Sequence, residues 1–292
     1  MGPCEEIKAH LPYISERGHN TWAKIQLNNT WEFSCIPYLP TFELVMEHVR
    51  RLKKLGIRGL MMSWTLGGYP SPIMHLAKEL LEGECDYDAW LTSTYGKDAD
   101  NVKRAVHIFS EAFKNYPMGE VLYNGPQSLG PLNFWYSEPT GLASTMVTFP
   151  YDAIDTWKLN WSPDPACIDN TDEEFCGAIQ RVVSGFSEGI AILEGSALTK
   201  NAEELLNMAK VMYINLYSLL LQFEYFRNRE NISKERALEL IEKDEALLFS
   251  LYEICKNDAR VGYEASNHYF FARNTFFEKL LNFEELKKEY SK

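Results

Sequence analysis

The hydrophobic pattern near the start of the chain alternates between short apolar runs and helical segments. The runs at 22–27 and 59–64 are typical of buried strands, and each ends in polar and aromatic residues. Between them, Thr41 is a good N-cap for a helix whose apolar residues recur at helical spacing over 42–52. A further helix is predicted over 5–17. The order helix, strand, helix, strand is typical of βαβ units, which predicts that the two strands are parallel and buried.

From Ser71 onward the pattern changes to long amphipathic helices. Residues 118–168 are rich in glycine, proline and aromatic residues and predict an irregular segment, with one strand candidate at 144–149. So long an irregular segment is uncommon unless it lines a functional surface. Helices are predicted over 101–116, from the capping box Thr171-x-x-Glu174, from Thr199 to Arg229, from Ser233 to Lys256 and from the capping box Thr275-x-x-Glu278. The C-terminal two-thirds is therefore predicted to be a helical bundle.

Two parallel strands are too few for a stable sheet, because parallel sheets are buried with helices on both faces. We therefore expect a fold between α/β and mostly α: the last βα units of an incomplete (β/α)8 barrel in residues 1–80, then a helical domain in residues 81–292. Two explanations stay open for the rest of the sheet. Earlier strands of a longer barrel could be missing from this sequence, which a pattern that starts with a helix favours. Alternatively, the strands could pair with another subunit in a homo-oligomer.

Charge and composition narrow the classes of partner. The net charge is −12 without a compensating basic block, which argues against nucleic acid and against an anionic membrane surface. No window reaches the roughly 18 apolar residues of a membrane span. The richest, 213–223, is interrupted by Asn215, Ser218 and Gln222. The N-terminus lacks the apolar core of a secretion signal, so a cytoplasmic location is expected.

The sequence predicts neither a metal site nor a cofactor. Its six cysteines form no Cys-x-x-Cys pair, which argues against a structural zinc site and against a disulfide framework. The histidines at positions 10, 19, 48, 75 and 107 are isolated, and His268 has no second histidine at ligand spacing. The sequence also lacks the patterns of phosphate loops, Rossmann folds, nucleophile elbows and kinases.

Polar and aromatic residues follow both predicted strands, where (β/α) barrels place their functional groups. Amides, a carboxylate and flat aromatic faces are the groups that bind a sugar ring, through hydrogen bonds to its hydroxyls and stacking on its C–H face. We therefore predict a saccharide site that contains Asn28, Asn29, Trp31 and Glu32 after the first strand and Trp64 and Tyr69 after the second. The alternative is that both tryptophans belong to the core and that the paired asparagines form a turn.

Glu32 is the candidate catalytic residue of this set. Beside tryptophans the pKa of its carboxyl could rise, which suits a general acid. Glycoside hydrolysis usually needs two carboxylates about 5 to 10 Å apart, and the sequence does not identify the second. Glu32 could instead accept a substrate hydroxyl or join a salt bridge. The carboxylates considered as its partner, in a polar loop or at a helix start, are Asp86, Asp88, Asp169, Asp172, Glu173 and Glu174.

A second segment dense in charged, amide and aromatic residues runs from Asp258 to Asn274, between two predicted helices. From this segment we add Glu264, Asn267 and His268 to the predicted substrate site. The segment could fold back over the strand ends, or it could be a hydrogen-bonded brace within the bundle. Both interpretations stay open.

Three stretches near the strands have a distinctive sequence: AKIQLNNTWE at 23–32, IPYLP at 36–40 and LMMSWTLGGYP at 60–70. Over residues 20–72 they resemble the last barrel strands of bacterial glycoside hydrolases akin to the family 20-type β-N-acetylhexosaminidases. The resemblance implies a (β/α)8 glycosidase for amino-sugar or related glycans, with a helical domain after the barrel. It also implies that Trp31 and Trp64 line the sugar subsite and that Glu32 binds a hydroxyl, unless it acts in catalysis. The family's adjacent Asp-Glu pair on a mid-barrel strand has no counterpart in this sequence.

Three hypotheses for function follow from the residues and the resemblance. The first is a glycoside hydrolase, or its C-terminal part, which contributes a portion of the sugar site. The second is a carbohydrate-binding protein without catalysis. The third is an interaction or scaffold protein built on the helical bundle, whose strands are completed by a partner chain.

Overall fold

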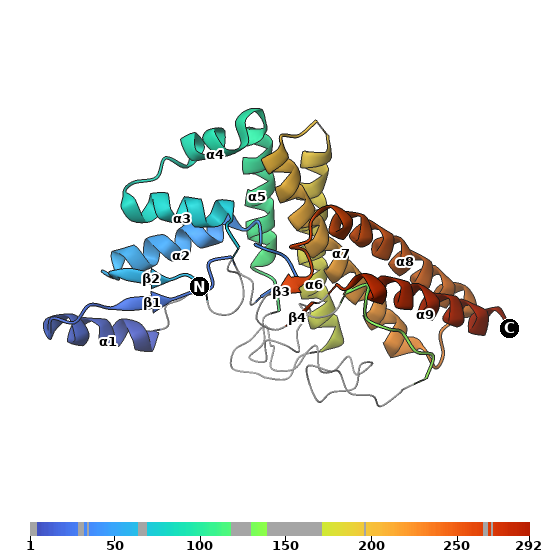
Figure 1. Cartoon of the computed structure of the whole chain (residues 1–292). Coiled ribbons are helices and arrows are strands. Elements are labelled where there is room, and N and C mark those ends of the chain that lie inside the picture. Colours follow the sequence, from blue (N-terminus) through green and yellow to red (C-terminus); the bar gives the residue numbers. More distant parts are fainter. Residues whose placement is uncertain are drawn as a thin grey trace.

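The structure is a computed structural model with a short strand-containing part at the N-terminus and a larger helical part (Figure 1). It describes residues 5–28, 32–33, 35–63, 69–117, 130–138, 171–195, 197–264, 268–269 and 271–292, with only the backbone described at 263–264 and 268–269. The prediction of a mostly α fold is confirmed.

The N-terminal part contains two parallel strands connected through a helix. Its elements are α1 (Glu5–Glu16), β1 (Trp22–Lys24), α2 (Phe42–Lys54), β2 (Gly59–Met61) and α3 (Pro72–Glu82). The two strands pair in parallel, with Trp22 opposite Gly59 and Lys24 opposite Met61. The predicted βαβ order is therefore confirmed for β1, α2 and β2.

Backbone hydrogen bonds continue the pairing past the regular strands. The Ile25 N–H donates to Met61 O at 2.9 Å, and the Leu27 N–H donates to Met62 O at 3.0 Å. The pairing therefore reaches the end of the predicted strand at 22–27, although its regular part is shorter.

One face of this small sheet is exposed. Because side chains alternate along a strand, Trp22 and Met61 point to the same face, and they are 69% and 49% exposed. The Trp22 ring lies over Gly59, where a Cβ atom would be 2.5 Å from ring carbons. The prediction that both strands are buried is wrong for this face, because no described element covers it.

The helix α2 buries the apolar stripe that its sequence predicts. The stripe consists of Phe42, Val45, Met46, Val49 and Leu52. It belongs to a hydrophobic core that continues through α3 into the helical part of the chain. The two parts are therefore held together by apolar packing.

The larger part consists of long helices and a small hairpin. Its elements are α4 (Tyr87–Tyr95), the 3-10 helix η1 (Gly96–Asp98), α5 (Ala99–Phe113), α6 (Asp172–Glu194), α7 (Lys200–Asn228), α8 (Lys234–Asn257), the antiparallel strands β3 (Tyr263–Glu264) and β4 (His268–Tyr269), and α9 (Arg273–Ser291). From α5 to α9, helices that follow one another in the chain pack against each other (Figure 1). The predicted bundle is present, whereas the hairpin was not predicted. The strand candidate at 144–149 lies outside the described residues.

Helix starts test the capping predictions. The capping box that opens α6 is confirmed: the Glu174 N–H donates to Thr171 Oγ1 at 3.1 Å, and the Thr171 N–H donates to Glu174 Oε2 at 2.8 Å. The start predicted at Thr275 is wrong, because α9 already begins at Arg273. Asp86 was predicted in a loop, and it caps α4 by accepting hydrogen bonds from two N–H groups of the first turn.

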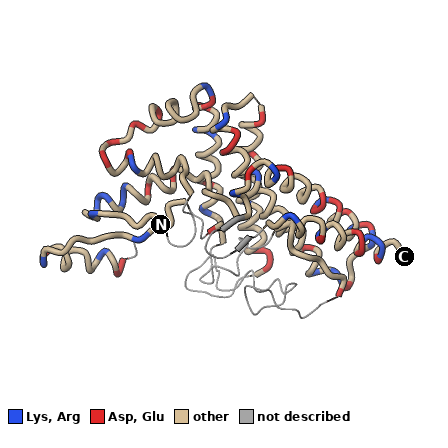
Figure 2. Tube along the Cα trace, viewed as in Figure 1, with Lys and Arg blue, Asp and Glu red and all other residues tan. Residues whose placement is uncertain are grey.

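Charged side chains of both signs are mixed along the helices (Figure 2). Many are paired one turn apart on the same helix, such as Lys243 with Glu239 at 2.7 Å. Within the described ranges, no helix is long and apolar enough to cross a membrane.

Candidate functional site at the strand ends

The parallel pairing of β1 and β2 brings the two predicted strand ends to the same edge of the sheet. The Asn28 amide connects them: its Nδ2 donates to Tyr69 O at 3.1 Å, and its Oδ1 accepts from Ser71 Oγ at 2.6 Å. Asn28 is 2% exposed. Asn28 and Tyr69 are therefore neighbours, and the asparagine side chain holds residues 69–71.

Ser71 is both a hydrogen-bond donor and a hydrogen-bond acceptor in this connection. Its Oγ accepts from the Met74 N–H at 3.2 Å and so caps α3, while its hydroxyl hydrogen is donated to Asn28. Pro72, at the first position of α3, already has the backbone angle that a helix requires. The end of β1 is thereby attached to the start of α3.

Glu32 is the described carboxyl group of the predicted site. The residue is partly exposed, but its Oε2 is inaccessible and has no hydrogen-bond partner in the described part of the chain. Burial raises the pKa of the Glu32 carboxyl above its ordinary value, against the opposing effect of its own backbone N–H. A carboxyl group in this state retains its proton at a higher pH than an exposed glutamate.

The backbone at Glu32 is held by a tyrosine three residues after the end of α5. The Tyr116 hydroxyl donates to Glu32 O at 2.6 Å. Burial raises the pKa of Tyr116 well above its ordinary value, and the nearby Glu32 raises it further. The phenol therefore stays protonated and can keep donating this hydrogen bond.

The segment that begins at Asp258 contacts the loop after β1. The Gly262 N–H donates a hydrogen bond of 2.7 Å to the backbone oxygen of Cys35. Cys35 lies three residues after Glu32 in the chain. Gly262 has a φ of 80°, and its Cα faces Phe271, whose N–H donates to Gly262 O at 3.2 Å. This contact favours the interpretation that the segment folds back toward the strand ends.

The base of the same segment is also braced in the bundle. Arg260 contacts both oxygens of Asp258 at 2.9 and 2.6 Å and reaches Glu204 of α7 at 3.1 Å. Burial alone would raise the pKa of the Asp258 carboxyl, but the hydrogen bonds from Arg260 outweigh burial and lower it. The two interpretations of this segment are therefore compatible.

The remaining predicted site residues lie beyond what the structure describes. Asn29, Trp31, Trp64 and Asn267 fall outside the described residues. Glu264 and His268 are backbone partners in the β3–β4 hairpin, and their side chains are not described.

Four of the carboxylates considered as a partner for Glu32 have structural roles, and Glu173 is an exposed residue in the first turn of α6. Asp86 caps α4, Asp88 pairs with Lys103 at 2.5 Å, and Asp172 pairs with Arg227 at 2.8 Å. Glu174 closes the capping box of α6, and Asp169 lies outside the described residues. A second catalytic carboxylate is therefore not identified in the described ranges.

A buried polar cluster in the helical part was missed by the sequence analysis. Asp244 of α8 and Lys279 of α9 are both fully buried. The Ser218 hydroxyl donates to Asp244 Oδ1 at 2.5 Å, while Asp244 Oδ2 has no partner in the described part of the chain. Burial raises the pKa of Asp244 to about 6 and lowers that of Lys279 to about 7, and in each case the other charge opposes the effect of burial.

This cluster attaches residues 130–136 to the helices. Lys279 Nζ donates to Asn133 O at 2.6 Å and lies 4.0 Å from the centre of the Phe283 ring. Gln222 donates to Gly130 O at 2.8 Å and accepts from Asn133 Nδ2 at 2.8 Å. In the sequence, the cluster was indicated only by the polar residues that interrupt the apolar window of α7, namely Asn215, Ser218 and Gln222. The sequence did not identify the partners of these residues.

No family model, curated protein or solved structure matches this chain, so its function has to be inferred from its own residues.

Proposed function

We propose that the strand ends form part of a saccharide site and that the chain is a glycoside hydrolase or the C-terminal part of one. The observation that carries this proposal is the state of Glu32, whose Oε2 is inaccessible and without a partner in the described residues. Burying a polar atom without a hydrogen bond costs free energy, and such exceptions often coincide with functional sites.

The raised pKa of Glu32 suits proton donation. A protonated carboxyl group can give its proton to the glycosidic oxygen as the bond to the sugar breaks, or it can donate a hydrogen bond to a bound sugar. Asn28 keeps the loop that contains Tyr69 at the same edge of the sheet as the Glu32 loop. In this proposal Trp31 and Trp64 line the sugar subsite, and Glu264, Asn267 and His268 approach it from the segment that contacts Cys35.

The exposed sheet face supports a larger barrel. Trp22 and Met61 are apolar, lie on one face and are substantially exposed, which is unusual for a parallel sheet. Further strands would extend this sheet at its edges, and closure into a barrel would cover that face. They would also supply the second carboxylate, as the adjacent Asp-Glu pair does in the family that the sequence resembles.

One observation favours a second candidate, a carbohydrate-binding protein without catalysis. Four of the carboxylates considered as partners of Glu32, namely Asp86, Asp88, Asp172 and Glu174, are engaged in caps or ion pairs. If Glu32 works without a second catalytic carboxylate, the site could bind a sugar but could not complete the usual hydrolysis.

Turnover and binding assays on the full chain distinguish these candidates. We would compare the wild type with Glu32→Gln and with Glu16→Gln, a control at an exposed position of α1, using chromogenic glycosides that include N-acetylhexosaminides. Turnover that disappears in Glu32→Gln and persists in Glu16→Gln supports the hydrolase. Binding to a glycan array without turnover, weakened in Glu32→Gln, supports the binding protein. Absence of both would contradict the proposal.

The scaffold hypothesis is tested by the state of assembly. A scaffold whose strands need a partner chain is expected to be an obligate oligomer. A well-folded monomer in sedimentation velocity would remove this hypothesis and would leave the two saccharide hypotheses unaffected.

A further inference from the structure

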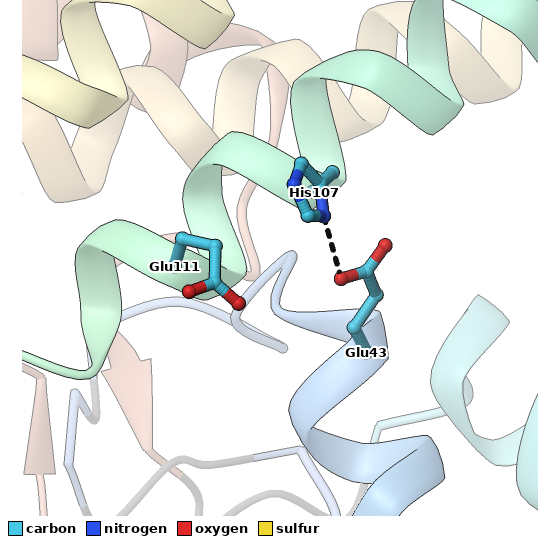
Figure 3. Close-up of side chains that lie close together, drawn as sticks. All are labelled: Glu43, His107 and Glu111. Atoms are coloured by element: carbon cyan, nitrogen blue, oxygen red, sulfur yellow. Dashed lines mark hydrogen bonds and ion pairs between the residues drawn. The ribbon is translucent and has the colours of Figure 1, made fainter.

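Three possible metal ligands meet on the surface between α2 and α5 (Figure 3). Glu43 comes from the first turn of α2, and His107 and Glu111 project from α5. One ligand atom from each residue lies within 4.8 Å of the other two, and His107 Nδ1 is 2.8 Å from Glu43 Oε2. We propose that these residues bind a divalent transition-metal ion such as Zn²⁺.

The position of the three side chains follows from helix geometry and tertiary packing. His107 and Glu111 are four residues apart on α5, so both lie on one face of that helix. The packing of α2 against α5 adds Glu43 to the same face. The set therefore depends on the folded protein, since Glu43 is distant from the other two residues in the sequence.

The donor set favours a transition metal over calcium or magnesium. An imidazole nitrogen with carboxylate oxygens suits Zn²⁺ and its neighbours, whereas Ca²⁺ and Mg²⁺ prefer oxygen ligands throughout. Ligand atoms about 2.0–2.2 Å from a tetrahedral zinc ion are roughly 3.4 Å from one another, so the hydrogen-bonded His107 and Glu43 would move slightly apart and the more distant donors would move closer. His107 is 59% exposed and Glu111 is 51% exposed, which leaves both side chains free to make that adjustment. Three protein ligands would leave further coordination positions open to water.

Positively charged side chains near the three ligands would compete with a metal ion for the carboxylates. Lys114 Nζ lies 2.5 Å from Glu111 Oε1, and a groove of about 460 Å³ beside the cluster is also lined by Arg50 and Lys54. Glu47, in the same groove, is paired with Arg51. An ion at the site would replace the Lys114 contact, and removing that lysine should strengthen binding.

Calorimetric titration of ZnCl2 into the EDTA-treated and dialysed full chain tests the proposal. We expect one ion per chain with a micromolar dissociation constant, and a loss of about tenfold or more in His107→Ala and in Glu43→Gln. The matched controls His10→Ala and Glu188→Gln change exposed residues of α1 and α6 and should bind as the wild type does. Lys114→Ala should bind several-fold more tightly.

A second readout separates a defined site from a folding defect. Co²⁺ in the wild type should give visible absorption bands that indicate a nitrogen and oxygen ligand set, and these bands should be lost in His107→Ala. Circular dichroism checks that each variant is folded. The proposal is overturned if Zn²⁺ does not bind below millimolar concentrations, or if His107→Ala and His10→Ala weaken binding equally. Glu32→Gln should leave Zn²⁺ binding unchanged, so the outcome is independent of the saccharide proposal.

Discussion

The hydroxyl of Tyr116 donates a hydrogen bond of 2.6 Å to the backbone oxygen of Glu32. This contact joins the residues that follow α5 to the loop after β1, and so the helical part of the chain helps to position the candidate site. Since Tyr116 is 8% exposed, water has little access to replace the hydroxyl.

Tyr116→Phe is therefore expected to lower the free energy of unfolding. The substitution keeps the ring but leaves a partly buried carbonyl without its donor, which costs about 1–3 kcal/mol. Urea unfolding followed by circular dichroism measures the change. Tyr13→Phe, at a tyrosine that is 57% exposed, is the matched control and should change stability by less than about 0.5 kcal/mol. If both substitutions lowered the free energy of unfolding equally, the hydrogen bond from Tyr116 to Glu32 would not contribute to stability.

Lys279→Met is expected to destabilise the fold strongly. It removes the donor to Asn133 O and leaves Asp244 buried without an opposing charge, which costs about 3–5 kcal/mol. The double variant Asp244→Asn with Lys279→Met should lose less than the sum of the two single changes, because neither charge remains. Lys256→Met, at an exposed ion pair, should cost less than about 1 kcal/mol. Simple additivity in the cycle would contradict the coupling.

The same pair predicts how stability depends on pH. The pKa of Lys279 falls from 10.5 to about 7 on folding, so the unfolded chain binds more protons between these values and stability rises with pH there. The pKa of Asp244 rises from 3.8 to about 6 on folding, so its contribution is present below pH 3.8 and is lost as the pH rises to 6.

The expected result is a minimum near pH 6–7 in the stability of the wild type relative to the double variant. That difference should rise by about 2 kcal/mol toward pH 9 and by a similar amount toward pH 4. Urea unfolding of both proteins across this range measures it, and the subtraction cancels groups that they share. A difference that does not vary with pH would rule out the buried titration of this pair.

Gly262→Ala is expected to detach the segment after α8 from the strand ends. At a φ of 80° a side chain is strained, and the new Cβ would lie 2.4 Å from Phe271 Cβ. We expect a loss of about 2 kcal/mol or more. Faster amide exchange at Gly262's neighbours would accompany it, since the hydrogen bond to Cys35 O is weakened. Gly83→Ala, where no atom lies within 4 Å of the new Cβ, should be nearly neutral by thermal unfolding.

Local sequence patterns were sufficient to predict those helices and strands that are determined mainly by residues close to one another in the chain. The βαβ order was predictable from two apolar runs around an amphipathic helix, and the start of α6 from Thr171 and Glu174. Thr275 presents the same capping pattern, but α9 begins two residues earlier. The start of α9 therefore does not follow from that pattern alone, and the chain enters this helix directly from the β3–β4 hairpin.

Contacts between distant residues could not be predicted in this way. Ser218 and Gln222 were visible as interruptions of an apolar helix, but their partners Asp244 and Asn133 lie on other segments. His107 looked isolated in the sequence because Glu43, its partner in space, belongs to another helix. At the strand ends, the sequence identified Glu32 and Asn28 as candidates, whereas the role of Asn28 in holding Tyr69 required the structure.

The hydrogen bond between Cys35 and Gly262 also has a consequence for synthesis on the ribosome. About 230 residues separate its two ends, and at about 5–20 residues per second the second end is made roughly 10 to 45 seconds after the first. During that interval the loop after β1 lacks its hydrogen bond from Gly262. The helices α5 to α8 can pair as they emerge, so the strand ends are expected to reach their final arrangement only late in synthesis, after residue 262 has been made.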